Sequence, residues 1–231
     1  MTDFPVSGLL FDCDGVLVDS LESAAVAWDL WSAEYAPDYN FRRDVVHGRR
    51  AGDTVLELVG AATAVDATRA LELLELSHVD GTVAIAGSLE LVSTLASGSW
   101  AIATSGTREL ALARLTAAGF PIPAELVTAE DVEQGKPHPD PYLLAAKLIG
   151  LDPAVCVVFE DAPAGIAAAR AAGVGTVVGV GEGALDSGAT VVVPDLAAVS
   201  YAHGALSIDE DRKSTRLNSS HSAVSRMPSS A

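Results

Sequence analysis

Two aspartates, Asp12 and Asp14, directly follow a short apolar run at residues 8–11. Such a run is typical of a buried strand in a parallel sheet. In open α/β folds, ligands bind just beyond the carboxyl ends of these strands. Two acids at that point could share a cation and divide nucleophilic from acid–base work. A turn explains the pair equally well, whereas a calcium-binding EF-hand loop is excluded because Gly15 comes too early.

Two further segments could bind an anion. A predicted strand at 100–103 leads into Thr104, Ser105 and Gly106 and then into a helix. This arrangement offers a hydroxyl and free backbone N–H groups to an anion, although simple helix capping would use the same residue types. Lys136 lies in a loop stiffened by two prolines, which suits a cation that must hold its position. A solvated loop lysine is the alternative.

A second pair of acids, Glu160 and Asp161, ends the apolar run at 155–159, and a helix follows. A capping aspartate is again the simpler explanation of this segment alone. Helix capping does not easily explain all four strand ends at once, because together they carry two acid pairs, a hydroxyl cradle and a rigid lysine. The combination favours an active site.

Strand and helix candidates alternate along the chain, which predicts an α/β fold with a doubly wound, parallel, Rossmann-like sheet. The strands are expected at residues 9–11, 100–103, 126–128, 155–159, 176–180 and 191–193. Helices are expected at 107–118, 140–150 and 161–173, where proline near the start or glycine at the end marks the boundaries.

The segment between the first and second strands interrupts this alternation. It contains helical patterns near 20–35, 53–60 and 66–78 and no good strand before residue 83. We therefore expect an all-helical cap over the acids, at 16–82, and a core at 1–15 and 83–205. An aromatic stripe of the cap either fills its interior or forms a substrate wall; it consists of Leu21, Trp28, Trp31 and Tyr35.

Composition excludes several classes of protein. Hydrophobic residues make up 49% of the 231, yet no run reaches the roughly 18 residues of a membrane span. The net charge of −17 disfavours binding to nucleic acid or to anionic membranes. Two cysteines and no secretory leader pattern indicate a reducing cytoplasm.

The segment 211–231 resembles the translation of a common sequencing-library adapter, so we exclude it from the fold as a non-native tail. A basic regulatory tail and a glycosylation site at Asn218 are the alternatives. The segment holds four basic residues and one acid, so the rest of the chain is even more acidic than the total charge suggests.

These motifs together resemble those of the haloacid dehalogenase-like hydrolase superfamily. Closer similarity is to its polyol- and sugar-phosphate phosphatases, of the glycerol-1-phosphatase and 2-deoxyglucose-6-phosphatase kind. The resemblance extends to about residue 200 and includes the helical cap. The four motifs of the superfamily correspond to Asp12 and Asp14, to Thr104, to Lys136, and to Glu160 and Asp161.

The resemblance implies a Mg²⁺-dependent phosphatase of small phosphomonoesters. Asp12 would attack phosphorus and Asp14 would act as acid and base, while Thr104 and Lys136 would stabilise the transferring group. The expected metal ligands are Asp12, the backbone carbonyl of Asp14, and Asp161, with Glu160 in support. Substrate contacts are expected from Ser105, Gly106, Ser20, His47, Arg49 and Arg50, with a surface arginine paired to cap acids as the alternative for Arg50.

Rival activities are separated by single residues. Dehalogenase relatives lack the acid that Asp14 supplies, and phosphonatases need a cap lysine, which residues 16–82 do not contain. Sugar phosphomutases form the same phosphoaspartate but carry a histidine where Ala24 stands. A non-catalytic phosphate sensor on the same fold is the alternative from another class.

Overall fold

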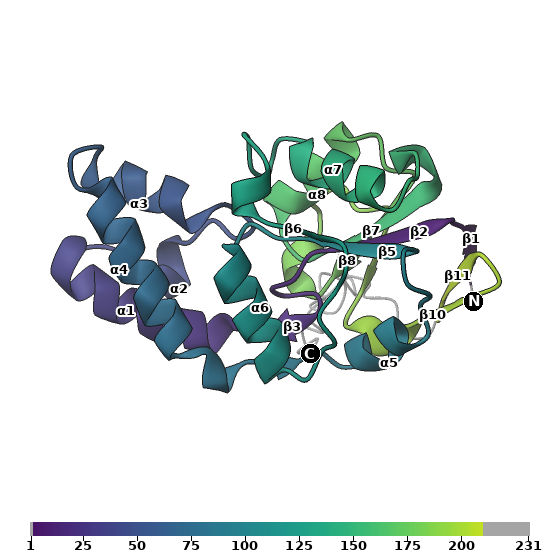
Figure 1. Cartoon of the computed structure of the whole chain (residues 1–231), viewed down its shortest axis with the longest axis horizontal. Coiled ribbons are helices and arrows are strands. Elements are labelled where there is room, and N and C mark those ends of the chain that lie inside the picture. Colours follow the sequence, from purple (N-terminus) through teal and green to yellow (C-terminus); the bar gives the residue numbers. More distant parts are fainter. Residues whose placement is uncertain (1, 210–231) are drawn as a thin grey trace, which may run out of the picture.

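A six-stranded parallel sheet forms the centre of the core (Figure 1). Its strands, in the order β6-β5-β2-β7-β8-β9, are β6 (Leu126–Val127), β5 (Trp100–Ala103), β2 (Gly8–Phe11), β7 (Cys156–Glu160), β8 (Thr176–Val180) and β9 (Val191–Val193). The chain runs outward from β2 to β5 and β6 and then returns to β7 on the other side. The computed structural model describes residues 2–209, so the predicted adapter-derived segment 211–231 lies outside the described residues.

Helices cover both faces of this sheet, which confirms the predicted doubly wound α/β fold. Helices α7 (Asp140–Leu148) and α8 (Pro163–Ala171) lie on one face, and α5 (Ser88–Ser93) and α6 (Arg108–Ala117) lie on the other (Figure 1). Short 3₁₀ helices occur at Val79–Gly81, Ala129–Asp131, Pro153–Val155, Glu182–Ala184 and Leu196–Ala198.

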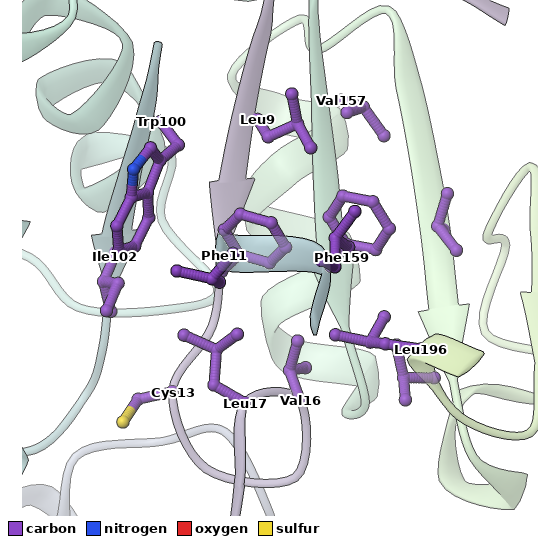
Figure 2. Packing of buried hydrophobic residues seen from close by; sticks show 14 of the residues in the cluster. Leu9, Phe11, Cys13, Val16, Leu17, Trp100, Ile102, Val157, Phe159 and Leu196 are labelled. Carbon is purple, nitrogen blue, oxygen red and sulfur yellow. The ribbon is translucent and has the colours of Figure 1, made fainter. Parts of the chain in front are cut away.

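The alternation of side chains along β2 explains why the sheet is buried on both faces. Leu9 and Phe11 point to the face covered by α5 and α6, and Leu10 points to the opposite face. The ring centroids of Phe11 and Phe159 lie 4.8 Å apart with nearly parallel planes, and Figure 2 shows the two rings beside each other. Burying each such side chain contributes roughly 2 kcal/mol. This packing fixes the strand ends that carry the acids.

The cap consists of four helices with a separate hydrophobic interior. They are α1 (Leu21–Tyr35), α2 (Phe41–Asp44), α3 (Ala51–Val59) and α4 (Ala64–Ser77). Trp31 is fully buried there, and its indole N–H donates to the carbonyl of Ala67 at 2.8 Å. The members of the aromatic stripe therefore have different environments: Trp31 fills the interior of the cap, whereas Leu21 is 48% exposed.

Five short strands were not predicted from the sequence. β3 (Val18–Asp19) pairs antiparallel with β4 (Val83–Ala84), and this pair joins the two chain connections between core and cap. The expectation of no strand between residues 14 and 83 was therefore wrong. β1 (Thr2–Pro5), β11 (Ala205–Ile208) and β10 (Val199–Ala202) form a separate antiparallel sheet. Among residues 2–209, no helix has the length and apolar character that crossing a bilayer requires.

Candidate active site

The carboxyl ends of β2, β5 and β7 open into a cavity of about 420 Å³ that the cap covers. Asp12 and Asp14 follow β2, Thr104 follows β5, and Asp161 follows β7; all four line this cavity. The position fits the general rule, because the strand order reverses around β2.

Lys136 lies beneath the cavity and contacts two of the acids. Its ammonium group is 2.8 Å from Asp12 Oδ1 and donates to Glu160 Oε1 at 2.7 Å. Burial alone would lower the pKa of Lys136, but the charges of Asp12 and Glu160 outweigh burial and raise the pKa above its usual value. Lys136 is therefore a permanent cation below Asp12.

Every oxygen of the Glu160 carboxylate is occupied. Oε1 accepts from Lys136 and from the Tyr142 hydroxyl, and Oε2 accepts the backbone N–H groups of Asp161 and Ala162. A Cβ atom at Gly165 would overlap with this carboxylate, so only glycine fits there. Glu160 thus supports Lys136 and the start of α8 rather than facing the cavity.

The carboxylates of Asp12, Glu160 and Asp161 offer oxygens that lie within 4.8 Å of one another. Burial, and next the charge of Glu160, raises the pKa of Asp12 from 3.8 to about 7, although Lys136 lowers it. The same two causes raise the pKa of Asp161 well above its usual value. Three carboxylates share a single buried ammonium group, so this cluster of hard oxygen donors keeps an excess of negative charge that fits a divalent cation such as Mg²⁺.

Backbone geometry near Asp14 also suits a cation. Gly15 adopts φ +78°, and a Cβ atom at this position would overlap with the Asp161 carboxylate. Glycine therefore lets the loop after β2 approach Asp161 closely. The carbonyl oxygen of Asp14 accepts no hydrogen bond from residues 2–209, which leaves it available as a ligand.

The loop after β5 has the character of an anion cradle. Thr104 is buried, and its Oγ1 accepts from the N–H of Gly106 at 3.1 Å, so its hydroxyl hydrogen is free to point elsewhere. The N–H of Ser105 donates to no residue in the part of the chain that the structure describes. A hydroxyl and an amide hydrogen thus remain available beside Asp12.

Two predicted binding residues make contacts between cap and core; Arg50 lies outside the cavity wall, whereas Ser105 is part of it. Arg50 does not line the cavity; its guanidinium donates to the carbonyls of Val132 and Glu133, at 2.8 and 3.0 Å. Ser105 Oγ donates to the carbonyl of Gly48 in the cap at 2.7 Å. In this structure both side chains therefore hold the cap against the core.

The predicted cap residues His47 and Arg49 do line the cavity. Burial lowers the pKa of His47, whose ring meets Phe41 edge-on. Arg49 forms an exposed ion pair with Glu57 at 2.6 Å. The rest of the cap wall is largely apolar, from Leu21, Ala24, Trp28, Phe41, Val45, Val46 and Ala51. Ala24, compared above with a histidine of sugar phosphomutases, lies in this wall.

Asp14 has two neighbours that hold its side chain. Ser20 lines the cavity, and its hydroxyl donates to Asp14 Oδ1 at 2.5 Å. Arg114 of α6 approaches the same oxygen at 3.1 Å and also binds Glu75 of α4. Sequence reasoning missed Arg114, Glu75 and Tyr142 because none belongs to a motif.

The comparisons with known proteins agree with this geometry. Residues 6–173 match the family model of haloacid dehalogenase-like hydrolases. Hexitol phosphatase A of Escherichia coli (strain K12) is 43% identical over 172 residues, which cover 72% of this chain and 79% of that protein. Glycerol-1-phosphate phosphohydrolase 2 of Saccharomyces cerevisiae is 35% identical over 180 residues, covering 73% and 72%.

A solved structure supports the same assignment. A hydrolase from Pseudomonas syringae superposes with a TM-score of 0.70 at 31% identity, covering 82% of this chain and 93% of that chain. The resemblance predicted from the motifs is confirmed. The chain belongs to the haloacid dehalogenase-like hydrolase family, and its relatives include phosphatases of polyol phosphates.

Proposed function

We propose that the protein is a Mg²⁺-dependent phosphatase that hydrolyses a small sugar or polyol phosphate through a phosphoaspartate on Asp12. The observation that carries the proposal is the position of Asp12. It lies in the cavity between cap and core, against a buried lysine and within an acid cluster, with Asp14 and Thr104 in the same wall.

In the first step, Asp12 attacks phosphorus. Its Oδ1 is held by Lys136 and by the N–H of Cys13, whereas Oδ2 has no partner among residues 2–209 and is free to act as nucleophile. The Thr104 hydroxyl and the Ser105 N–H bind phosphoryl oxygens, and Lys136 offsets the negative charge at Asp12. Asp14 donates a proton to the departing alkoxide.

In the second step, Asp14 takes a proton from water, and the resulting hydroxide attacks the phosphoaspartate. Asp12 and inorganic phosphate are released. Asp12, Asp161 and the Asp14 carbonyl would hold Mg²⁺, with Glu160 supporting them from below. The bound ion supplies charge that stabilises the phosphoryl oxygens and the ionised form of Asp12.

The proposed substrate class follows from the cavity and the relatives. A space of about 420 Å³ suits a small phosphomonoester, and the two named relatives act on hexitol and glycerol phosphates. His47 and Arg49 are proposed to contact the substrate from the cap. The net charge of −17 disfavours nucleic acid and anionic membranes as partners. Two free, buried cysteines suit a reducing cytoplasm.

The test is the release of inorganic phosphate from a panel of hexitol, glycerol and hexose phosphates, with Mg²⁺ or with a chelator. We expect Mg²⁺-dependent release from at least one member and none from Asp12→Asn. Accumulation of an isomerised sugar phosphate without free phosphate would instead indicate a mutase. Binding of phosphate esters without turnover would indicate a sensor.

A further inference from the structure

Two opposite charges lie buried where the cap meets the core. Arg114 lies on α6, and Glu75 lies on α4, a neighbouring helix of the cap (Figure 1). Their side chains are each 7% exposed, and Arg114 donates from Nη2 to Glu75 Oε1 at 3.1 Å. Both residues line the cavity. The pair therefore joins the two parts of the molecule inside the cavity wall.

Stability alone explains this pair poorly. Removing two charges from water is expensive, and buried ion pairs are often no more stabilising than apolar side chains of similar volume. The Nε–H of Arg114 is buried and has no hydrogen-bond partner among residues 2–209. A cation held at this cost calls for a role besides packing.

The geometry around Asp14 supplies that role. The Nη1 atom of Arg114 is 3.1 Å from Asp14 Oδ1, and the Ser20 hydroxyl donates to the same oxygen. Both contacts use Oδ1, and Oδ2 accepts no hydrogen bond in the part of the chain that the structure describes. The carboxyl group, which lines the cavity, is therefore held through one oxygen while the other stays available.

We propose that Arg114 is a positioning residue for Asp14 and that Glu75 makes this positioning depend on the docked cap. The proposal rests on the proposed acid–base role of Asp14. Arg114 and Ser20 hold Oδ1, so Oδ2 carries the proton toward the leaving group. Because Glu75 belongs to the cap, both Nη atoms of Arg114 have an acidic partner only when the cap covers the cavity.

The chemistry defines which step should suffer when Arg114 is lost. As the bond from Asp12 to phosphorus forms, the bond from phosphorus to the leaving oxygen breaks. An alkoxide then needs the proton of Asp14, whereas a nitrophenolate departs without one. A misplaced Asp14 should therefore slow the first release of an alcohol much more than the first release of nitrophenolate.

The experiment measures the first turnover of Arg114→Met with two substrates, an alkyl phosphate that the wild type hydrolyses and p-nitrophenyl phosphate. We expect first-turnover alcohol release to slow by about 30- to 300-fold, which approaches the loss of an entire general acid. First-turnover nitrophenolate release should stay within about threefold of wild type, and KM for both substrates should change by less than about threefold.

Two further variants and two controls make the result specific. Glu75→Gln should slow alcohol release by about 3- to 10-fold, because the cap partner of Arg114 loses its negative charge and keeps only an amide oxygen as acceptor. Arg114→Lys should recover part of the rate, because the charge returns without the fork of the guanidinium. The controls Arg69→Met and Glu72→Gln, on the same helix as Glu75 and outside the cavity wall, should match wild type.

Four results would overturn the proposal. These are equal slowing of both first releases, no slowing of either, an increase in KM with unchanged kcat, and an equal loss in the two controls. If Arg114→Met does not fold, Glu75→Gln/Arg114→Met removes both charges of the pair and must show the same selective loss. Absence of wild-type turnover with every phosphomonoester refutes the phosphatase instead, so the two failures are distinguishable.

Discussion

The ammonium group of Lys136 lies 2.8 Å from Asp12 Oδ1 and 2.7 Å from Glu160 Oε1, and none of the three groups is more than marginally exposed. Lys136 comes from the loop after β6, Asp12 follows β2, and Glu160 ends β7. One buried cation thus links three segments and balances part of the negative charge at the cavity floor.

Replacing this cation is expected to destabilise the protein. Lys136→Met leaves Asp12 and Glu160 buried without a counter-charge, which typically costs about 3–5 kcal/mol. Urea unfolding at pH 7.5 with a chelator measures the loss, and added Mg²⁺ should reduce it. Lys147→Met, on the exposed side of α7, is the control. Equal stability of the two variants would contradict the charge balance described here.

The affinity for Mg²⁺ is expected to depend on pH. Burial and the charge of Glu160 raise the pKa of Asp12 to about 7 in the metal-free protein, and the pKa of Asp161 is raised as well. Mg²⁺ needs both carboxylates ionised, so its binding releases protons and strengthens as the pH rises through 7.

The same pKa shifts determine whether the stability of the metal-free protein rises or falls with pH. Because the pKa of Asp12 is higher in the folded than in the unfolded protein, the metal-free protein loses stability as the pH rises from about 4 to 7. Mg²⁺ should recover that loss, so the increase in Tm that it causes should be larger at pH 8 than at pH 5.5. An increase that is larger at pH 5.5 would contradict this sign.

Removal of the second acid is expected to slow turnover without unfolding the protein. Asp14→Ala should lower the rate with an alkyl phosphate by about 10²- to 10⁴-fold, the usual contribution of general acid–base catalysis. Steady-state phosphate release measures the effect, and circular dichroism verifies the fold. A loss of less than tenfold would remove Asp14 from the mechanism.

Two neighbouring arginines of the cap should behave differently. Arg50→Ala removes hydrogen bonds to two core carbonyls and should lower the free energy of unfolding by about 1–3 kcal/mol. Arg49→Ala removes an exposed ion pair with Glu57 and should cost less than about 1 kcal/mol, while raising KM. If Arg50→Ala raises KM and leaves stability unchanged, Arg50 binds substrate as the sequence first suggested.

The core of the site was predictable because its residues sit at strand ends. Apolar runs of four or five residues locate the strands, and the polar residues that directly follow these runs lie at one edge of a parallel sheet. Asp12, Thr104 and Asp161 were found in this way. The short strands β3, β4, β10 and β11 escaped because partly exposed runs of two to four residues carry little hydrophobic pattern.

The supporting residues were harder to identify because their positions look like ordinary helix interior. Arg114 shares the buried face of α6 with Leu110 and Leu115, and Glu75 shares that of α4 with Leu71. A charge on each of two apolar faces was the available signal for a buried pair. Which helices face each other, however, depends on how the cap docks, and no local pattern contains that information.

The central claim, that Asp12 forms the phosphoaspartate, is tested most directly by chemical trapping. The enzyme is mixed with Mg²⁺ and a hydrolysed phosphomonoester, quenched in acid within the first turnover, and reduced with borohydride before mass spectrometry of the peptide that contains residue 12. We predict reduction of Asp12 to homoserine, absent in Asp12→Asn. Rapid turnover without modification of Asp12, or with modification at another carboxylate, would contradict it.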